Sequence, residues 1–391
     1  MKNALVKMAL LALLLPGSAK AQDITVTWQV TGDKISTGYL PKVASDGQNY
    51  VATIDMENAF PVHDGFPNSP FQYQLGAIDA ASIGWTGADY FLHSPPQPQG
   101  DHQIGHAPSL ALYYETGAPN CDTAVEVHQG AQHMDSELWY QLGRFCSTAG
   151  IRWFHASHYA NGYNATVAAD NNETFPRKTT VVEVHQADNA TSALFYQVGV
   201  VTGSAPPSIS WGPSTAIIQS NGSALQGNLP TVSIANNLAI IVAEDAEGGL
   251  WYSFGSVDTS TSTIAWSDPI SYGNGFNPTV SIFGDGTAAY GLGTGRVVVE
   301  AHQMYPGTGS LLYTAGLLAG TPPTSITWSS SVDNYYATGC YPSVALSFDG
   351  LAPSNPTTGS TSSLSLTATN EIDCGTGSTI EYSFGYLVAT P

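Results

Sequence analysis

Residues 252–266 read Tyr-Ser-Phe-Gly-Ser-Val-Asp-Thr-Ser-Thr-Ser-Thr-Ile-Ala-Trp, and the pattern inside them decides the fold. A Tyr-x-x-Gly stretch is followed, after a polar turn, by Ile-x-Trp. The same pair of signatures recurs along the whole chain. The further copies are 73–76 with 83–85, 140–143 with 151–153, 196–199 with 209–211, and 313–316 with 326–328. A repeat this regular indicates one structural unit used several times.

The repeat is divided between the two ends of the chain. A sixth Tyr-x-x-Gly, at 382–385, has no Trp after it, whereas Ile24-Thr-Val-Thr-Trp28 near the start has no Tyr-x-x-Gly before it. A period of about 55–70 residues with many short β-like runs is typical of a propeller. We therefore predict an all-β, six-bladed β-propeller of four-stranded blades, closed by pairing of the N-terminal strand with the C-terminal blade.

Each repeat contains four strand-like runs. An apolar run with small residues follows Gly-x-x-Pro and is predicted to line the central channel as strand A. Strand B is a run such as Val-Glu-Val-His-Gln, strand C carries Tyr-x-x-Gly, and strand D carries Ile-x-Trp. We expect the six strand D tryptophans to pack between blades.

The first 21 residues predict a secretory signal peptide. Lys2 and Lys7 precede an apolar run at 8–15, and Ala19-Lys-Ala21 forms a small-residue cleavage site. The alternative, a retained anchor, is disfavoured because the run is too short to span a bilayer. We expect residues 1–21 to be removed, residues 22–391 to form a single propeller domain, and the protein to be secreted or periplasmic without membrane insertion.

The charge balance limits the classes of partner. Lys and Arg together number 10 against 30 Asp and Glu, and the net charge is −20. Binding to a phosphate backbone needs a basic surface that releases counterions, so nucleic acid is excluded as a partner. The acidity suits neutral ligands or weak cation binding.

The four cysteines predict two disulfides in an exported chain. Cys121 and Cys146 flank a predicted hairpin, and Cys340 and Cys374 both fall in the last blade. We favour the pairings 121–146 and 340–374 over the other two connectivities and over four free thiols.

The strand B motif Glu-x-His-Gln has two possible roles. Strand periodicity places its Glu and His on one face. They can form a buried polar network that links blades, in which each polar group has a partner. Alternatively, they can form equivalent glycan sites, which need an open pocket in each repeat. The candidate binding residues are Glu126, His128, Gln129, Glu183, His185, Gln186, Glu300, His302 and Gln303. Symmetric sites would indicate a lectin, because a catalytic site breaks the repeat.

The histidines gather on the face formed by B-to-C turns and D-to-A connectors. Imidazole suits Zn or Cu, so a divalent metal site is conceivable there, although no regular ligand motif is present. The candidate ligands are His102, His106, His155 and His158. Surface or loop-stabilising histidines are the simpler interpretation, and no cofactor is otherwise expected.

The combination of Val-Glu-Val-His-Gln, Tyr-x-x-Gly and Ile-x-Trp resembles secreted bacterial propeller proteins of the lectin and sialidase-like kind. The resemblance concerns architecture, since the sialidase Ser-x-Asp-x-Gly-x-Thr-Trp box is missing and the chain has only four arginines. It implies a rigid ring that binds a ligand, and we expect carbohydrate or a glycoconjugate.

Two alternatives to a lectin stay open. One is an extracellular glycan hydrolase with its site in the irregular loops of blades one to three, where Asp64, Asp101 and Glu126 are the candidate carboxylates. The other is a surface or matrix protein that serves as an interaction platform.

Overall fold

The structure is a computed structural model of the 391-residue chain. It describes residues 23–56, 69–79, 82–87, 89–90, 104–114, 121–130, 136–147, 149–154, 156–172, 178–188, 190–202, 207–284, 295–307, 309–320, 323–330, 333–348, 364–374 and 378–390. The predicted signal peptide lies outside these residues.

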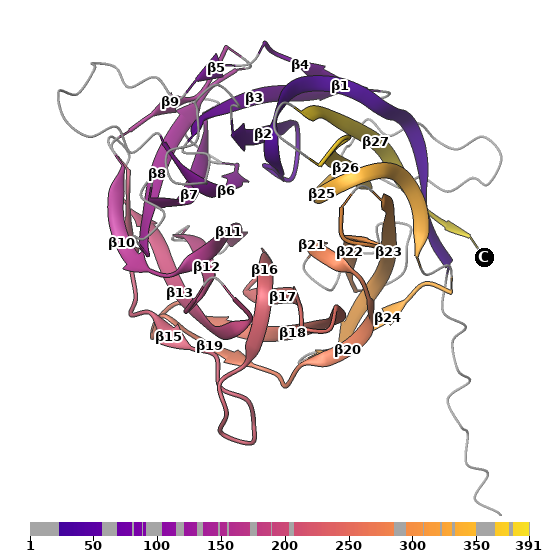
Figure 1. Cartoon of the computed structure of the whole chain (residues 1–391). Helices are drawn as coiled ribbons and strands as arrows, with labels where there is room; N and C mark the ends of the chain where they lie inside the picture. Colours follow the sequence, from indigo (N-terminus) through magenta and orange to yellow (C-terminus); the bar gives the residue numbers. More distant parts are fainter. Residues whose placement is uncertain are drawn as a thin grey trace, which may run out of the picture.

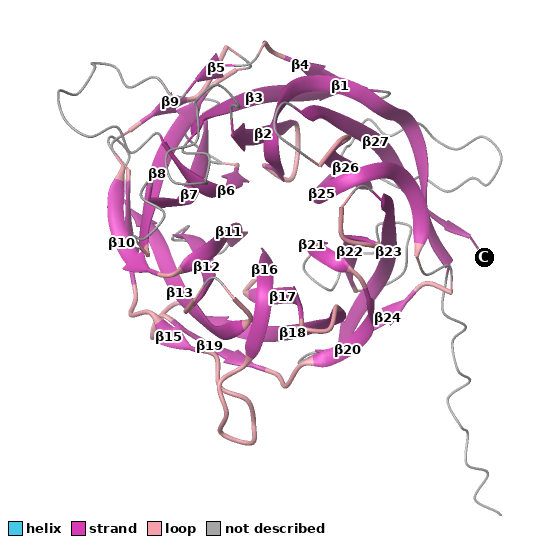
Figure 2. Cartoon of the chain, viewed as in Figure 1, coloured by secondary structure: helices cyan, strands magenta, loops and turns pink. Residues whose placement is uncertain are grey.

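The described chain is built from β-strands without a helix (Figure 2). The strands of the N-terminal half are β1 (Asp23–Ser45), β2 (Tyr50–Met56), β3 (Ser69–Asp79), β4 (Ser82–Trp85), β5 (Asp89–Tyr90), β6 (Ile104–Tyr113), β7 (Asp122–Gly130), β8 (Glu137–Phe145), β9 (Arg152–Trp153), β10 (Ser157–Asn161), β11 (Tyr163–Asn172), β12 (Lys178–Gln186) and β13 (Ser192–Thr202). Those of the C-terminal half are β14 (Ser208–Trp211), β15 (Thr215–Ala216), β16 (Gln226–Ala235), β17 (Leu238–Glu244), β18 (Gly249–Asp258), β19 (Thr263–Trp266), β20 (Ile270–Asn274), β21 (Phe276–Phe283), β22 (Arg296–Gln303), β23 (Gly309–Gly320), β24 (Pro323–Trp328), β25 (Asn334–Phe348), β26 (Leu364–Glu371) and β27 (Ser378–Thr390).

The strands form antiparallel meanders. β7 pairs with β6 and β8, and β8 pairs with β9; the same order holds for β11 to β14, β16 to β19 and β21 to β24. The meanders stand around a common centre, with β6, β11, β16 and β21 innermost (Figure 1). Pairings between the ends of successive meanders, such as β3 with β6 and β13 with β16, join the strands into a 17-stranded and a 10-stranded sheet.

The two ends of the chain share one meander. Strand β1 pairs with β27 along most of its first half, with Ile24 opposite Ala389 and Trp28 opposite Gly385. Its second half pairs with β2, so that one long strand belongs to two neighbouring meanders. The predicted pairing of the Ile24–Trp28 segment with the C-terminal strand is confirmed.

The glycine of each Tyr-x-x-Gly signature is needed because the Ile-x-Trp side chains cover it. A Cβ atom on Gly255 would lie 2.4 Å from Cγ2 of Ile264 and 2.9 Å from the ring of Trp266. The same crowding by the side chains of an isoleucine and a tryptophan occurs at Gly76, Gly143, Gly199 and Gly316. At Gly385 the nearest atoms are the Thr27 carbonyl oxygen, Cγ1 of Val26 and Cα of Trp28. The two signatures therefore recur together because they pack against each other on adjacent strands.

The tyrosine of each signature contacts the tryptophan of the following repeat. The Tyr73 hydroxyl bonds the backbone N–H and C=O of Ile151, and its ring meets Trp153 edge to face at 5.8 Å. The equivalent ring pairs are Tyr140–Trp211, Tyr196–Trp266, Tyr252–Trp328, Tyr313–Trp28 and Tyr382–Trp85. The tryptophans thus link successive meanders, which confirms their predicted packing role.

The core lies between the facing sheets of neighbouring meanders. One cluster joins Val182 and Val184 of β12 to Val232 and Ile234 of β16 and to residues of β17. Because each meander buries both of its faces in this way, its strands are apolar on both sides near the middle of the sheet.

The two predicted disulfides are confirmed. Cys121 bonds to Cys146, and Cys340 bonds to Cys374. In the part of the chain that the structure describes, there is no helix with the length and hydrophobicity needed to cross a membrane.

Candidate functional site

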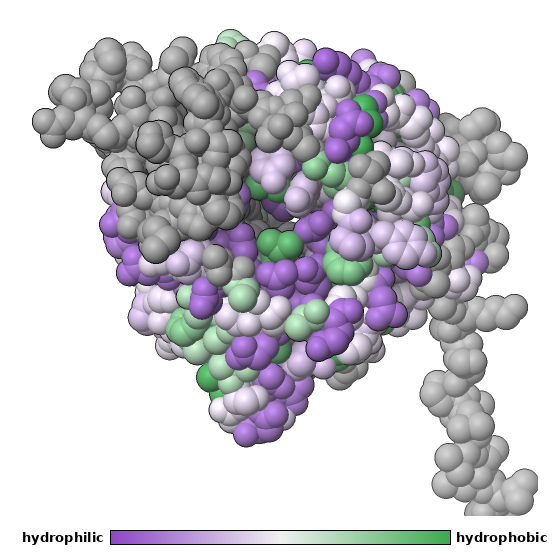
Figure 3. Space-filling view, viewed as in Figure 1, coloured by the Kyte–Doolittle hydropathy of each residue, from purple (hydrophilic) through white to green (hydrophobic). Residues whose placement is uncertain are grey.

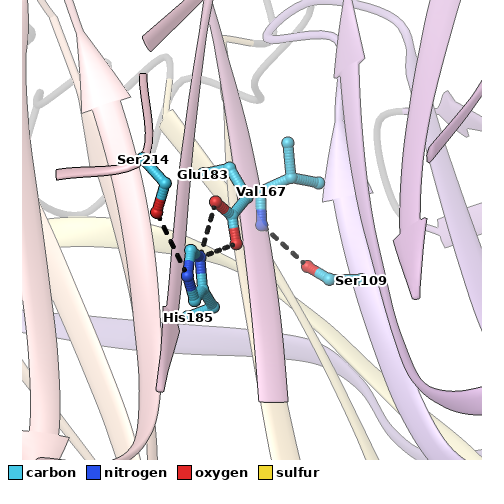
Figure 4. A network of polar contacts seen from close by, with 5 residues as sticks. All are labelled: Ser109, Val167, Glu183, His185 and Ser214. Atoms are coloured by element: carbon cyan, nitrogen blue, oxygen red, sulfur yellow. Dashed lines mark hydrogen bonds and ion pairs between the residues drawn. The ribbon is translucent and has the colours of Figure 1, made fainter. Parts of the chain in front are cut away.

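The Glu and His of the strand B motif form buried pairs. The Nδ1 atom of His185 lies 3.0 Å from both carboxylate oxygens of Glu183 (Figure 4), and His128 has the same geometry with Glu126. In the third copy His302 lies 3.1 Å from Glu300. The carboxylates are completely buried. Burial raises the pKa of Glu126, while the neighbouring His128 lowers it.

The glycine of Gly-x-x-Pro, or of its counterpart Gly162-Tyr-Asn-Ala165, makes room for the imidazole of its own repeat. A Cβ atom would lie 2.3 Å from Cδ2 of His185 if added to Gly162, and 2.4 Å from that of His302 if added to Gly275. In the structure these imidazoles are at most 2% exposed. The pairs therefore belong to a packed polar interior, and binding of a glycan through them stays a prediction.

The glutamine of the motif connects two repeats. Oε1 of Gln186 accepts a bond from the side-chain amide of Asn164 and from the backbone N–H of Leu229 in the next repeat. Its Nε2 donates to the carbonyl of Ala190 in the adjoining turn. Gln303 repeats the arrangement with Tyr341 N–H and the Gly307 carbonyl.

The backbone N–H groups that these glutamines bind come from residues with left-handed geometry. Leu229 and Tyr341 have φ of 46° and 49°, and Leu40, Ala107, Asn164 and Asn277 have similar values at the same place in Gly-x-x-Pro or its equivalent. A left-handed conformation is costly for such residues. The bonds of Gln186 and Gln303 therefore stabilise a strained bend at the inner end of the repeat that follows each of them.

Three repeats carry a different residue at the glutamine position. The strand register places Glu244, Glu371 and Met56 where β12 has Gln186. Strand β17 ends at Glu244, and the register makes this residue the last of the motif, so Glu244 is the counterpart of Gln186 and not of Glu183. The two glutamates break the repeat, which the symmetric Glu–His pairs do not.

The two glutamates differ in how their oxygens are bonded. In Glu244 one oxygen accepts the Asn228 side-chain amide at 2.7 Å and the other accepts the Asn277 N–H at 2.9 Å. In Glu371, Oε1 accepts the Leu40 N–H at 2.5 Å, whereas Oε2 is buried without a partner among the described residues. Burial raises the pKa of Glu371 to about 7. A carboxylic acid with this pKa holds and releases a proton at neutral pH.

Two half-buried tyrosines lie next to Glu371. The rings of Tyr39 and Tyr341 meet edge to face at 5.9 Å. Burial, Tyr341 and the charge of Glu371 all raise the pKa of Tyr39, so this phenol stays protonated. We call Tyr39, Tyr341 and Glu371 the β1–β26 cluster, after the junction where the ends of the chain meet.

Neighbouring structure fixes the position of this cluster. Glu371 is the last residue of β26 and lies opposite Cys340, whose disulfide to Cys374 holds the following turn. The Leu40 N–H bond ties the carboxyl to the first strand. Glu371 is therefore held by a strand, by a nearby covalent crosslink and by a hydrogen bond.

A second carboxylate flanks the same segment of β1. Asp55 accepts bonds from the Ser36 hydroxyl at 3.1 Å and from the Gln72 amide at 2.5 Å. A Cβ on Gly38 would lie 2.0 Å from Asp55 Oδ1. Asp55 thus lies beside Gly38, and Glu371 is bonded to Leu40. Their environments differ, because Asp55 accepts bonds from polar side chains, whereas Glu371 has an unpaired oxygen.

The predicted metal site lies only partly within the described residues. His102 and His155 fall outside them, and His158 packs edge to face on Trp139 at 5.6 Å. No group of three or more His, Cys, Asp or Glu side chains suitable for a metal occurs among the described residues. Asp64 and Asp101, the candidate hydrolase carboxylates of the loops, also lie outside them.

Sequence reasoning missed Glu371. Strand β26 ends in Ala368-Thr-Asn-Glu371, which lacks both the Glu and the His of the motif and was therefore not aligned with it. The one available signal was Gly339-Cys-Tyr-Pro342, because each Gly-x-x-Pro must bind a residue at the end of a strand B.

Similarity to known proteins is confined to structure. No protein-family model matches the chain, and no curated protein matches it. A Hadza microbial sialidase, Hz136, superposes with a TM-score of 0.57 and 8% identity over 90% of this chain and 68% of its own. The NanB sialidase from Streptococcus pneumoniae gives 0.47 and 8% over 93% and 70%, and a GH43_1 enzyme from Xanthomonas citri gives 0.44 and 9% over 77% and 92%. The chain has the sialidase-like β-propeller architecture.

Proposed function

We propose that the protein is a glycan-acting hydrolase whose general acid is Glu371. The observation that carries the proposal is the unpaired, buried carboxyl oxygen of Glu371 at a position where equivalent repeats have glutamine. A catalytic group breaks the symmetry of a repeat, and a carboxyl with a pKa of about 7 can donate a proton to a leaving alcohol at neutral pH.

The surroundings of Glu371 suit a sugar. Tyr39 and Tyr341 offer aromatic rings for the apolar face of a pyranose and hydroxyls for its polar edge. Both tyrosines are half-buried, and Tyr39 lies close enough to Glu371 for the charge of the carboxylate to raise the pKa of the phenol. The centre of one face of the molecule is hollowed, and both hydrophilic and hydrophobic residues border the hollow (Figure 3).

Asp55 is the second carboxylate in this proposal. Glycosidases of most kinds use two carboxyl groups, one protonated and one ionised. The Ser36 hydroxyl and Gln72 amide bonds to Asp55 stabilise its charged form, whereas Glu371 has one backbone bond and an unpaired oxygen. We assign the acid to Glu371 and the base or nucleophile to Asp55.

We propose neutral glycans as the substrates. With 10 Lys and Arg against 30 Asp and Glu, the chain offers few groups to hold an anionic sugar. The described neighbours of Glu371 are tyrosines and backbone, without a paired arginine. The proposal therefore takes up the hydrolase alternative of the sequence analysis and moves its site from the loops to the junction of β1 and β26.

The test is hydrolysis of a panel of neutral and anionic fluorogenic glycosides by the full chain. Glu371→Gln should lower kcat by about 100-fold or more, because a general acid contributes roughly that much. Glu244→Gln is the matched control, since it converts the other symmetry-breaking carboxylate, and it should leave activity unchanged. Equal activity of the wild type and Glu371→Gln on every cleaved glycoside would overturn the proposal.

We also propose six four-stranded blades and export from the cytoplasm. Six copies of the Tyr–Trp ring contact, each between one repeat and the next, support this blade count. Two disulfides and the signal-peptide pattern at 1–21 support export. Mass spectrometry of the secreted protein, with an N-terminus at Gln22 expected, tests the second point.

A further inference from the structure

A serine, a histidine and a glutamate are in consecutive contact beside the C-terminal part of β12. The Ser214 hydroxyl is 3.5 Å from Nε2 of His185, whose Nδ1 is 3.0 Å from both oxygens of Glu183 (Figure 4). The serine is exposed, whereas the glutamate is fully buried and the histidine is 2% exposed. This is the order of groups that activates a serine nucleophile: hydroxyl, imidazole and orienting carboxylate.

The imidazole is fixed in the tautomer that this chemistry requires. Two carboxylate oxygens face Nδ1, and both are acceptors, so Nδ1 carries the proton and Nε2 has its lone pair free for the serine hydroxyl. Phe195 stacks on the ring with the planes 13° apart, and Gly162 packs so close to the imidazole that an added Cβ atom would lie 2.3 Å from its Cδ2. His185 is therefore held rigidly toward Ser214.

The serine is placed by a short, well-anchored segment. Gly212 N–H bonds the Val198 carbonyl, Pro213 fixes the next backbone angle, and Thr215 pairs with Tyr196 in the sheet. Ser214 is thus held beside Nε2 of His185 by the anchored backbone on both sides of it.

The other two Glu–His pairs do not share this arrangement. Nε2 of His128 has no partner among the described residues, and Nε2 of His302 lies 3.9 Å from the Asp333 carboxylate. A structural role of the Glu–His pair is common to the three repeats. The hydroxyl at Nε2 is confined to His185 among them, so it is not required by that shared role.

We propose that Ser214 is the nucleophile of a second, acyl-transfer site that hydrolyses short-chain carboxylic esters. The Ser214 oxygen attacks the ester carbonyl carbon as His185 Nε2 accepts the hydroxyl proton. The ester C–O bond breaks, and His185 returns this proton to the departing alcohol. Water then attacks the acyl-serine and gives a proton to His185, which passes it to the Ser214 oxygen as the free acid leaves.

The position of Ser214 defines the substrate class. The residue is exposed and lies on a connector between the exposed Pro213 and the half-buried Thr215. An exposed serine suits an acetyl group on a large polar molecule, because a long acyl chain would need an apolar pocket to bury it. Acetyl esters are therefore the expected substrates, and Glu183 is a positioning residue because it acts through His185.

The experiment uses the full chain, a fluorophosphonate probe and p-nitrophenyl acetate. We expect the probe to label Ser214, located by peptide mass spectrometry, and Ser214→Ala to lose the label and to lower kcat/KM by about 100-fold or more. Ser223→Ala is the control, because Ser223 is also exposed and its hydroxyl bonds only locally, to Asn221. Glu183→Gln, with folding checked by circular dichroism, should lower kcat more than it raises KM.

Several results would overturn the proposal. These are no labelling of folded protein, labelling that persists in Ser214→Ala, or equal ester hydrolysis by the wild type and Ser214→Ala. The glycoside assay of Glu371→Gln is independent of these measurements. That variant should keep full esterase activity, so failure of one proposal is distinguishable from failure of the other.

Discussion

The Trp28 ring meets the Tyr313 ring edge to face, with centroids 5.8 Å apart and planes at 88°. The Tyr313 hydroxyl also accepts a bond from the Val26 N–H at 3.0 Å. These contacts join the first strand of the chain to β23, which lies almost 300 residues later in sequence. The same Tyr–Trp contact links each of the remaining pairs of successive repeats, and this copy joins the two ends of the chain.

Removing this contact should destabilise the whole fold. Trp28 also stacks on Tyr336 at 5.6 Å, so Trp28→Ala leaves a gap in the packing between β1 and β25. We expect a loss of about 2–4 kcal/mol in the free energy of unfolding. This is somewhat less than the loss on truncating a fully buried Trp, because the Trp28 ring is only partly buried. Urea denaturation followed by tryptophan fluorescence measures it. An unchanged midpoint would show that the closing strand does not stabilise the ring.

A methyl group at Gly255 should be destabilising. Its Cβ would lie 2.4 Å from Ile264 Cγ2, and the Trp266 ring cannot move because it is packed against Tyr196. We expect Gly255→Ala to cost about 1–3 kcal/mol in urea unfolding, in the range of an overpacked core. Gly273→Ala is the control, since nothing lies within 4 Å of a Cβ there. Equal costs for both variants would mean that the Tyr-x-x-Gly glycine is not set by packing.

The repeated features were predictable from the sequence because packing enforces them in every repeat. The side chains of Ile83 and Trp85 crowd Gly76, and residues 26–28 from the other end of the chain crowd Gly385, so the signature survives in each copy and reveals the closure. The disulfides followed for a related reason, since Cys121 and Cys146 sit at the ends of one hairpin. A packing contact that every repeat makes therefore leaves the same residues at the same place in each copy of the sequence.

The candidate site could not be predicted in the same way. Glu371 differs from Gln186 by one functional group, and only the pairing of β25 with β26 shows that the two are equivalent. Its unpaired oxygen and its high pKa depend on burial beside Tyr39, a residue more than 300 positions away in sequence. Burial of the Glu–His pairs, likewise, follows from neighbouring sheets and not from the motif.

The two disulfides should contribute similarly to stability but differently to activity. Their loops of 25 and 34 residues each predict about 3–4 kcal/mol from restriction of the unfolded chain. Cys340 lies opposite Glu371, whereas Cys121 precedes β7 in a different repeat. Replacing Cys340 and Cys374 with Ser should therefore lower glycoside hydrolysis in folded protein, and replacing Cys121 and Cys146 should not. Equal activity of the two double variants would contradict the assignment of the site.

The pH dependence of stability should change in Glu371→Gln. The carboxyl has a folded-state pKa of about 7 against an ordinary value of 4.5, because burial disfavours its charged form. Well below pH 4.5 the carboxyl is protonated in both the folded and the unfolded chain, so its full contribution to stability is present. As the pH rises from 4.5 through 7, the unfolded chain ionises first, so the free energy of unfolding falls. The loss reaches at most about 3.5 kcal/mol, since the difference of about 2.5 pKa units corresponds to about 1.4 kcal/mol per unit.

Glutamine at position 371 carries no charge and repeats the residue found at 129, 186 and 303. Its amide can donate to the adjoining turn as the amides of Gln186 and Gln303 do. We expect Glu371→Gln to match the wild type at pH 4.5 and to exceed it in urea unfolding at pH 8. A variant that is less stable than the wild type at pH 8 would mean that Glu371 is ionised and stabilising in the fold, which would remove the basis for its role as an acid.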